Sequence, residues 1–170
     1  MATFFSVFFF IALAGLAVGT LIAVKVWYTL PFFFIILIAL CFGSFFIGVL
    51  LGGALFSWLP LLFTKIVIVL FCIGIAYFFF RQFHPSYGYF SYRGWIHWAL
   101  LAGFFLLIGI DFANIGLSSW FLLLLLPAFG GMLLVGAFAM ANLKSMFRGT
   151  PVFIYLPLVL FVFLGLIKLI

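Results

Sequence analysis

The sequence predicts an all-α membrane protein, a polytopic bundle of about six transmembrane helices. Of its 170 residues, 71% are hydrophobic and only 5% are charged. A water-soluble domain carries about a quarter charged residues, and without them its surface would be one apolar, aggregating patch. Long apolar runs separated by short polar breaks fill the chain, so residues 1–170 are expected to form a single transmembrane domain.

The first half of the chain contains three of these runs. A helix needs about 20 apolar residues to cross about 30 Å of hydrocarbon. Lys25 ends the first run, and Pro60 opens the third, which Arg81 ends. The second run is long, so a tilt or a kink near Gly52–Gly53 is expected. The three predicted helices cover residues 3–24, 31–59 and 60–80.

The second half begins after the longest polar stretch, residues 81–94, whose Tyr, Phe and His residues are typical of a membrane interface. Ser118 is a predicted helix cap, and Pro151 stands where the first turn of a helix tolerates proline. The three predicted helices cover residues 95–116, 118–141 and 151–169.

The basic residues predict the orientation of the chain. Lys25 lies in the first connection, Arg81 and Arg93 in the third, and Lys144 and Arg148 in the fifth. Loops rich in Lys and Arg stay in the cytoplasm, so both termini are expected on the non-cytoplasmic side. The main alternative has five helices, with residues 95–141 folded differently.

An internal repeat relates the two halves. Leu13-Ala14-Gly15 recurs 88 residues later as Leu101-Ala102-Gly103. Phe42-Gly43-Ser44 recurs 87 residues later as Phe129-Gly130-Gly131. Pro60 and Gly74 recur 91 residues later as Pro151 and Gly165. Two halves of three helices have opposite orientations in the membrane, as in the inverted repeats of many transporters. A chance match between apolar sequences is the alternative explanation.

Asp111, the only acidic residue of the chain, falls inside a predicted span. A charge there costs at least about 2.5 kcal/mol and marks a candidate functional site. Asn114 and Ser118 follow at helical spacing and extend a polar stripe. Lys65 lies at a similar predicted depth, so we expect it to pair with Asp111 or to share a water-filled cavity. A structural salt bridge is the alternative to a proton or cation site.

Small residues form two rows at a spacing of four. One row consists of Ser44, Gly48 and Gly52, and the other of Gly15 and Gly19. Such rows let helix backbones approach closely, within a bundle or between subunits.

The sequence predicts neither a cofactor nor a metal site, and no enzyme. His97 and His84 are expected at the membrane interface. Cys41 and Cys72 are expected to be inert, buried thiols. A paired carboxylate, a phosphate-binding glycine loop and a nucleophile with a base are all missing from the sequence. The basic residues are scattered singly, which predicts no nucleic-acid partner.

Two short stretches resemble known families. Phe147-Arg148-Gly149 and the helix closing on Gly165-Leu166-Ile167-Lys168-Leu169 resemble the last helix of the membrane subunits of Rnf-type and sodium-pumping quinone reductases. That resemblance implies a six-helix inverted repeat, but the cluster-binding cysteines of its first and fourth helices are missing here. Ile110-Asp111-Phe112-Ala113 resembles the acidic motif of small cation exporters such as the manganese-efflux family, which also has an acid in its first helix, where this chain has none.

These observations predict an integral membrane protein that works as a small transporter or channel-like unit for a cation, a proton or a small solute. Asp111, Lys65 and Asn114 would line its route. The alternative is a non-catalytic scaffold subunit of a larger energy-transducing or secretion complex. In either case the expected partners are the lipid bilayer and other membrane subunits or further copies of the chain, because so few polar groups line an internal pathway.

Overall fold

In the computed structural model, every secondary-structure element of the described residues is a helix. The structure describes residues 2–24, 31–56, 58–84, 88–90, 95–116, 120–146 and 151–169, and these contain six α-helices, one 3-10 helix and no strand. The all-α prediction is therefore confirmed. The elements are α1 (Ala2–Ala23), α2 (Pro31–Ala54), α3 (Leu61–Gln82), α4 (Ile96–Ile115), α5 (Trp120–Met146), η1 (Pro151–Tyr155) and α6 (Leu156–Leu169).

Two helix ends differ clearly from the sequence prediction. α2 stops at Ala54, where the N–H groups of Leu55 and Phe56 both donate hydrogen bonds to the Leu51 carbonyl oxygen and close the helix with a turn. α5 continues to Met146, and Lys144 in its last turn donates a hydrogen bond to the Val24 carbonyl oxygen at 2.8 Å. A cation is favourable at that end of a helix.

The last predicted helix divides into η1 and α6. Pro157 has no N–H to donate to the carbonyl four residues earlier, so regular α-helical bonding begins near this proline. By length and composition, α1 to α5 can each cross a membrane, whereas the last apolar helix, Phe153–Leu169, is shorter.

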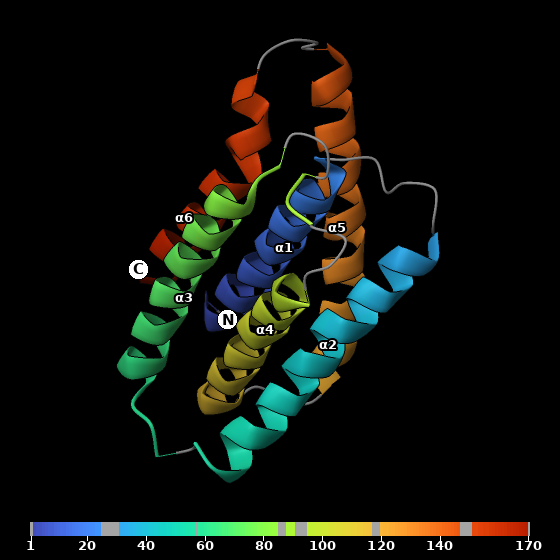
Figure 1. Cartoon of the computed structure of the whole chain (residues 1–170). Coiled ribbons are helices and arrows are strands. Elements are labelled where there is room, and N and C mark those ends of the chain that lie inside the picture. Colours follow the sequence, from blue (N-terminus) through green and yellow to red (C-terminus); the bar gives the residue numbers. More distant parts are fainter. Residues whose placement is uncertain are drawn as a thin grey trace.

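The helices pack as two related groups. α1 packs against α5 and α6, α4 packs against α2 and α3, and the contact of α3 with α6 joins the groups (Figure 1). The packing pairs are symmetric between the two halves of the chain. If α1 is exchanged with α4, α2 with α5 and α3 with α6, the same set of packing pairs results. These are the correspondences that the internal repeat predicts.

Glycines allow the closest of these contacts. In the pair of α1 and α5, a Cβ at Gly15 would lie 2.6 Å from the Phe129 carbonyl oxygen, and one at Gly19 would overlap the Leu133 carbonyl. Because both numbers rise together, the two helices run parallel. The row Gly15–Gly19 is therefore a packing surface within the bundle, as predicted.

The pair of α2 and α4 repeats this arrangement. A Cβ at Gly48 would overlap the Leu106 carbonyl, and one at Gly52 would lie 2.7 Å from the Ala113 Cβ. Ser44, the third member of the predicted row, is half-buried on the same helix. Each glycine row thus holds one helix of the first half against one helix of the second half.

Candidate ion-pair site

Asp111 lies in the last two turns of α4, where three helices meet. Its side chain is 3% exposed and forms a salt bridge with Lys168 of α6 through Oδ2. The hydroxyl of Thr64, in the first turn of α3, donates a hydrogen bond to Oδ1 at 3.2 Å. The same hydroxyl lies 2.9 Å from the Leu61 carbonyl oxygen, so its one proton is shared between that carbonyl and Asp111, and the salt bridge with Lys168 is the main partner of the buried carboxylate.

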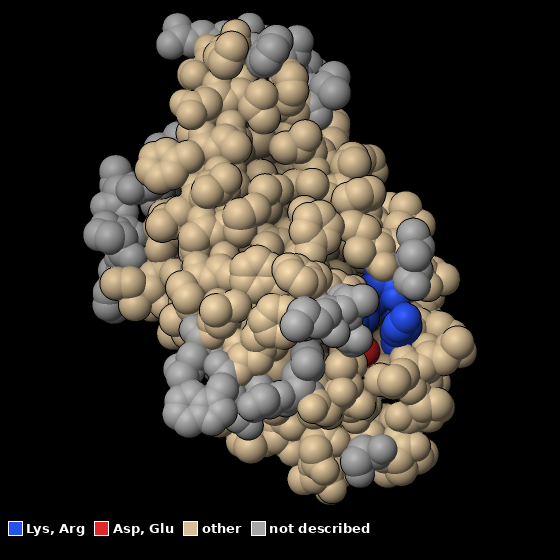
Figure 2. Space-filling model, turned by 180° about the vertical axis from the view of Figure 1, so that it is seen from behind, with Lys and Arg blue, Asp and Glu red and all other residues tan. Residues whose placement is uncertain are grey.

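Lys168 lies in the last turn of α6, and its side chain is 12% exposed. Its ammonium nitrogen lies 5.2 Å from the centroid of the Phe10 ring of α1, within the range of a cation–π interaction. Figure 2 shows the acidic side chain recessed beside basic side chains, and these are the charged atoms visible on this face among the described residues.

The predicted ion pair of Asp111 with Lys65 is wrong. The expected depth agrees with the structure, because Thr64, the neighbour of Lys65, reaches Asp111. Successive side chains of a helix point about 100° apart, so Thr64 is buried while Lys65 remains partly exposed. The sequence did contain a signal for the true partner: Lys168 is the other basic residue within a predicted span.

Asn114 lies three residues after Asp111, so both side chains project from neighbouring parts of the α4 surface. The amide nitrogen and oxygen of Asn114 are buried, and neither has a hydrogen-bond partner within the described structure. An unpaired buried amide costs about 1–3 kcal/mol. The polar stripe predicted from the sequence therefore contains hydrogen-bonding capacity that the other described residues do not use.

An apolar cleft of about 150 Å³ adjoins Thr64 between α3 and α4. Thr64 is the polar member of its lining, so one side chain separates the cleft from the Asp111 carboxylate. The lining consists of Phe56, Leu59, Phe63, Thr64, Val67, Leu107 and Ile110.

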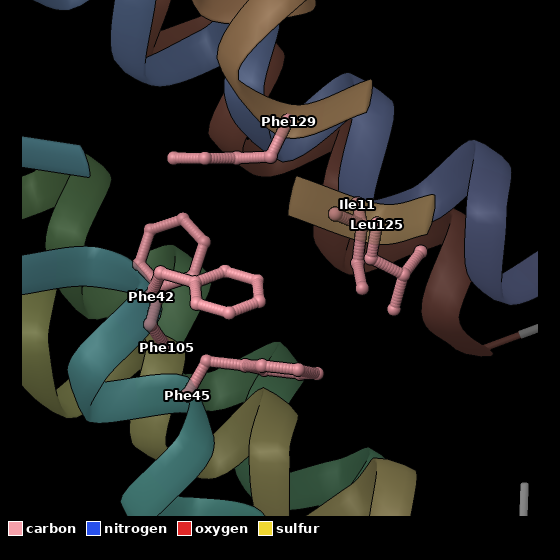
Figure 3. A pocket seen from close by; sticks show the side chains of 6 residues that line it. All are labelled: Ile11, Phe42, Phe45, Phe105, Leu125 and Phe129. Atoms are coloured by element: carbon pink, nitrogen blue, oxygen red, sulfur yellow. The ribbon is translucent and has the colours of Figure 1, made fainter. Parts of the chain in front are cut away.

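A second cavity lies between α1, α2, α4 and α5, and Figure 3 shows the side chains that point into it. Its volume of about 10 Å³ admits one water at most, and it has no polar lining. It is therefore not a polar route through the bundle. The lining residues are Ile11, Phe42, Phe45, Phe105, Leu125 and Phe129.

His97 was expected at the membrane interface, and the structure shows that its side chain is buried within the bundle near the start of α4. The residue is 1% exposed, and its ring centroid lies 5.6–5.9 Å from those of Phe78, Phe79 and Phe90. An imidazole presents an apolar body to such an aromatic cluster. The sequence places His97 directly after the polar stretch, and Phe90 of that stretch packs against it.

Tyr89 closes the same end of the bundle. Its hydroxyl donates a hydrogen bond to the Ile154 carbonyl oxygen at 2.7 Å, which ties the loop before α4 to η1. Burial, with a smaller contribution from Tyr155, raises the pKa of the Tyr89 phenol above its ordinary value. The phenol therefore stays neutral and keeps its donated proton.

The remaining predicted residues form no ligand set in the described structure. Cys41 and Cys72 are buried free thiols. Among the described residues, no three His, Cys, Asp or Glu side chains gather as metal ligands would. Lys25, Arg93, Arg148 and Ser118 lie outside the described residues.

The apolar helices define the class of this protein: it is a multi-pass helical membrane protein. Comparison with protein-family models, curated proteins and solved structures finds no match to the chain.

Proposed function

We propose that the protein is a small transporter or channel-like unit for a cation, a proton or a small solute, with Asp111 as the site of exchange. The buried Asp111–Lys168 pair is the observation that carries the proposal. Desolvating two charges typically cancels their attraction, so a buried ion pair is a poor device for stability. Intramembrane ionisable residues instead mark ion or substrate pathways.

The arrangement of the helices supports the same proposal. Inverted repeats are a common plan of secondary transporters, and their sites lie where the two repeats meet. Asp111 of the second half is bound by Thr64 of the first half and Lys168 of the second. The site therefore lies across the contact between halves, where a relative movement would change its coordination.

An inverted repeat of two three-helix halves requires six membrane crossings, so η1 and α6 together must be long enough to cross. α6 has 14 residues and η1 has five. At about 1.5 Å and about 2.0 Å of rise per residue, the two together reach about 31 Å, enough for the hydrocarbon core. Six crossings place both termini on one side, which we propose is the non-cytoplasmic side.

The route would pass Asp111, Thr64 and Asn114, with Lys168 as the resident counter-charge and Lys65 at the rim. The cavity between α1, α2, α4 and α5 is apolar and admits a single water at most, so among the described residues it offers ions no open path. Transport would require the two groups of helices to move relative to each other.

The test is a flux measurement in proteoliposomes with Asp111→Asn. Dissipation of an imposed proton gradient by added cations, followed with an entrapped pH-sensitive dye, should fall to the level of protein-free liposomes. Arg81→Gln, which removes an exposed charge in the last turn of α3, should keep the wild-type rate. A wild-type rate for a well-folded Asp111→Asn protein would end the proposal.

A scaffold subunit is the second candidate, and the wholly apolar lining of the cavity between α1, α2, α4 and α5 favours it. In that case the ion pair would fix α4 against α6 during assembly. Purification in mild detergent separates the two candidates: a uniform homo-oligomer that transports in liposomes supports the first, and obligate copurification with other membrane subunits supports the second.

A further inference from the structure

We propose that Asp111 and the adjoining cleft bind a small organic monocation, an alkylammonium, in place of the ammonium group of Lys168. This inference rests on the proposed function, because it names the chemical class of the cargo.

The charge of the site favours a monocation. Asp111 supplies the only carboxylate of the chain, and Lys168 already neutralises it. Exchanging one monovalent cation for another leaves the buried site neutral. A divalent ion in place of Lys168 would leave a net positive charge in a medium of low dielectric constant, at a cost of several kcal/mol by the desolvation argument.

The surroundings of the carboxylate favour an organic cation over a metal ion. A desolvated hard metal ion needs about six oxygen ligands. The described residues next to Asp111 add the Thr64 hydroxyl and the Asn114 amide oxygen, which is too few. By contrast, the Phe10 ring already faces an ammonium group at 5.2 Å, and aromatic rings recognise organic cations in this way.

The cleft supplies space for the carbon body of such a ligand. Its volume of about 150 Å³ is below the range of pockets for drug-sized ligands, which limits the ligand to a few carbons, and its walls are apolar Phe, Leu, Val and Ile side chains. Thr64 belongs both to the cleft and to the hydrogen-bonded site. The cleft surface at Thr64 is apolar, so the ligand's charged end would reach Asp111 when the whole Thr64 side chain changes rotamer.

Two further features make the exchange feasible. Lys168 lies in the last turn of α6 and is 12% exposed, so its long side chain can swing to the membrane surface and place the ammonium in water. The buried Asn114 amide oxygen has no partner among the described residues, so it can accept a hydrogen bond from the N–H of the ligand.

The test follows the release of Lys168 in the wild-type protein. The purified full chain in detergent is treated with a water-soluble amine-acylating reagent, with and without N,N-dimethylbutylammonium, a tertiary ammonium that the reagent does not acylate. The probe should raise acylation of Lys168, measured by mass spectrometry, by on the order of tenfold and in a saturable way. Lys65 and Lys144 serve as internal controls and should react at unchanged rates.

Sodium chloride, added at the same ionic strength as the probe, should leave the acylation rate of Lys168 unchanged. In Asp111→Asn, Lys168 should react rapidly without the probe, and the probe should change nothing further. Unchanged acylation of Lys168 at saturating probe, or an equal rise at Lys65, would overturn the proposal.

Equilibrium binding gives an independent test. Lys168→Met removes the competing ammonium while keeping a side chain of similar length, so it should bind the probe about tenfold more tightly than wild type. Val67→Phe, which fills the cleft, should weaken binding at least tenfold, whereas Ile66→Phe on the exposed side of α3 should not. Equal binding by the two α3 variants would contradict the cleft as the site.

These measurements need no gradient, so they separate the two proposals. A protein that binds the probe but transports nothing contradicts the proposed function alone. A protein that transports protons or inorganic cations in an Asp111-dependent manner, but keeps Lys168 protected from acylation, contradicts this inference alone.

Discussion

Asp111 and Lys168 bring opposite charges together in the interior of a chain with 5% charged residues. The two side chains are not equally enclosed, because the Lys168 side chain is 12% exposed and that of Asp111 is 3% exposed. The flexible lysine can escape to water when its partner is removed, whereas the short aspartate cannot. Loss of the lysine should therefore be more harmful than loss of the aspartate.

A double-mutant cycle tests this asymmetry. Lys168→Met leaves an unpaired buried carboxylate and should lower the free energy of unfolding by about 3–5 kcal/mol. Asp111→Asn should cost clearly less, and the double variant should recover most of the loss of Lys168→Met because no buried charge remains. Thermal or denaturant unfolding in detergent measures each step.

Additive losses in the double variant would contradict direct coupling of the two charges. A reversed order, with Asp111→Asn the more damaging variant, would show that Lys168 is as enclosed as Asp111.

The sequence identified the acidic residue of this site but not the residues that bind it. Asp111 stands out because an acid in an apolar run is costly, and Asn114 follows from the helical period. The partner was assigned by depth along the membrane, and depth does not specify direction around a helix. Lys65 and Thr64 differ by one residue, yet Thr64 is buried and Lys65 is partly exposed.

At the scale of the helices, close backbone contact is concentrated at the glycine rows of α1 and α2. Gly48 and Gly52 face α4, whereas a Cβ added at Gly53 of the same helix would meet no neighbouring atom of the described residues within 4 Å. Membrane helices lack a hydrophobic driving force for association, so close packing supplies much of their mutual attraction. A single methyl group should therefore have opposite effects at neighbouring positions of α2.

The matched pair is Gly48→Ala and Gly53→Ala. Gly48→Ala forces a Cβ into the Leu106 carbonyl and should destabilise the bundle by about 1–3 kcal/mol or more. Gly53→Ala has room for its methyl group and should be neutral or stabilising by up to about 1 kcal/mol, because alanine favours a helix over glycine.

Unfolding midpoints of the two variants in detergent provide the measurement. Equal midpoints for the two variants would contradict the packing of α2 on α4 through this row.

Most helix positions followed from hydrophobic length, whereas the ends did not. α2 ends five residues before the predicted boundary at residue 59, and α5 extends five residues beyond residue 141. Hydropathy specifies the part that lies in hydrocarbon. The actual ends depend on local turns such as that of Leu55 and Phe56, and on partners such as the Val24 carbonyl, which accepts the hydrogen bond of Lys144.

At the scale of the whole molecule, the exchange of α1 with α4, α2 with α5 and α3 with α6 preserves the packing pairs. Each group combines helices of both halves, since α1 packs with α5 and α6. Lys168 of α6 lies over Phe10 of α1, so the end of α6 and the first half of α1 share one side of the bundle. An even number of crossings, which we propose above, would give this placement.

Reporters fused to the two termini test the crossing number. A periplasmic-type reporter, active only outside the cytoplasm, should be active at both ends, and a cytoplasmic reporter should be inactive at both. We expect this orientation because loops rich in Lys and Arg stay in the cytoplasm. The basic residues concerned are Lys25, Arg81, Arg93, Lys144 and Arg148.

Reporters on opposite faces would mean an odd number of crossings, with α6 lying outside the hydrocarbon. That result would contradict the inverted arrangement in the membrane and place Lys168, on α6, outside the hydrocarbon.

The sequence by itself determined the class of fold and the approximate helix positions, and it singled out Asp111 as a candidate site, because length, hydropathy and the cost of an intramembrane charge are local properties of the chain. Only the tertiary structure decided that Lys168 and Thr64 bind Asp111, that an apolar cleft adjoins them, and that His97 is buried. These features depend on which faces of distant helices meet, and that is set by close packing across the whole bundle.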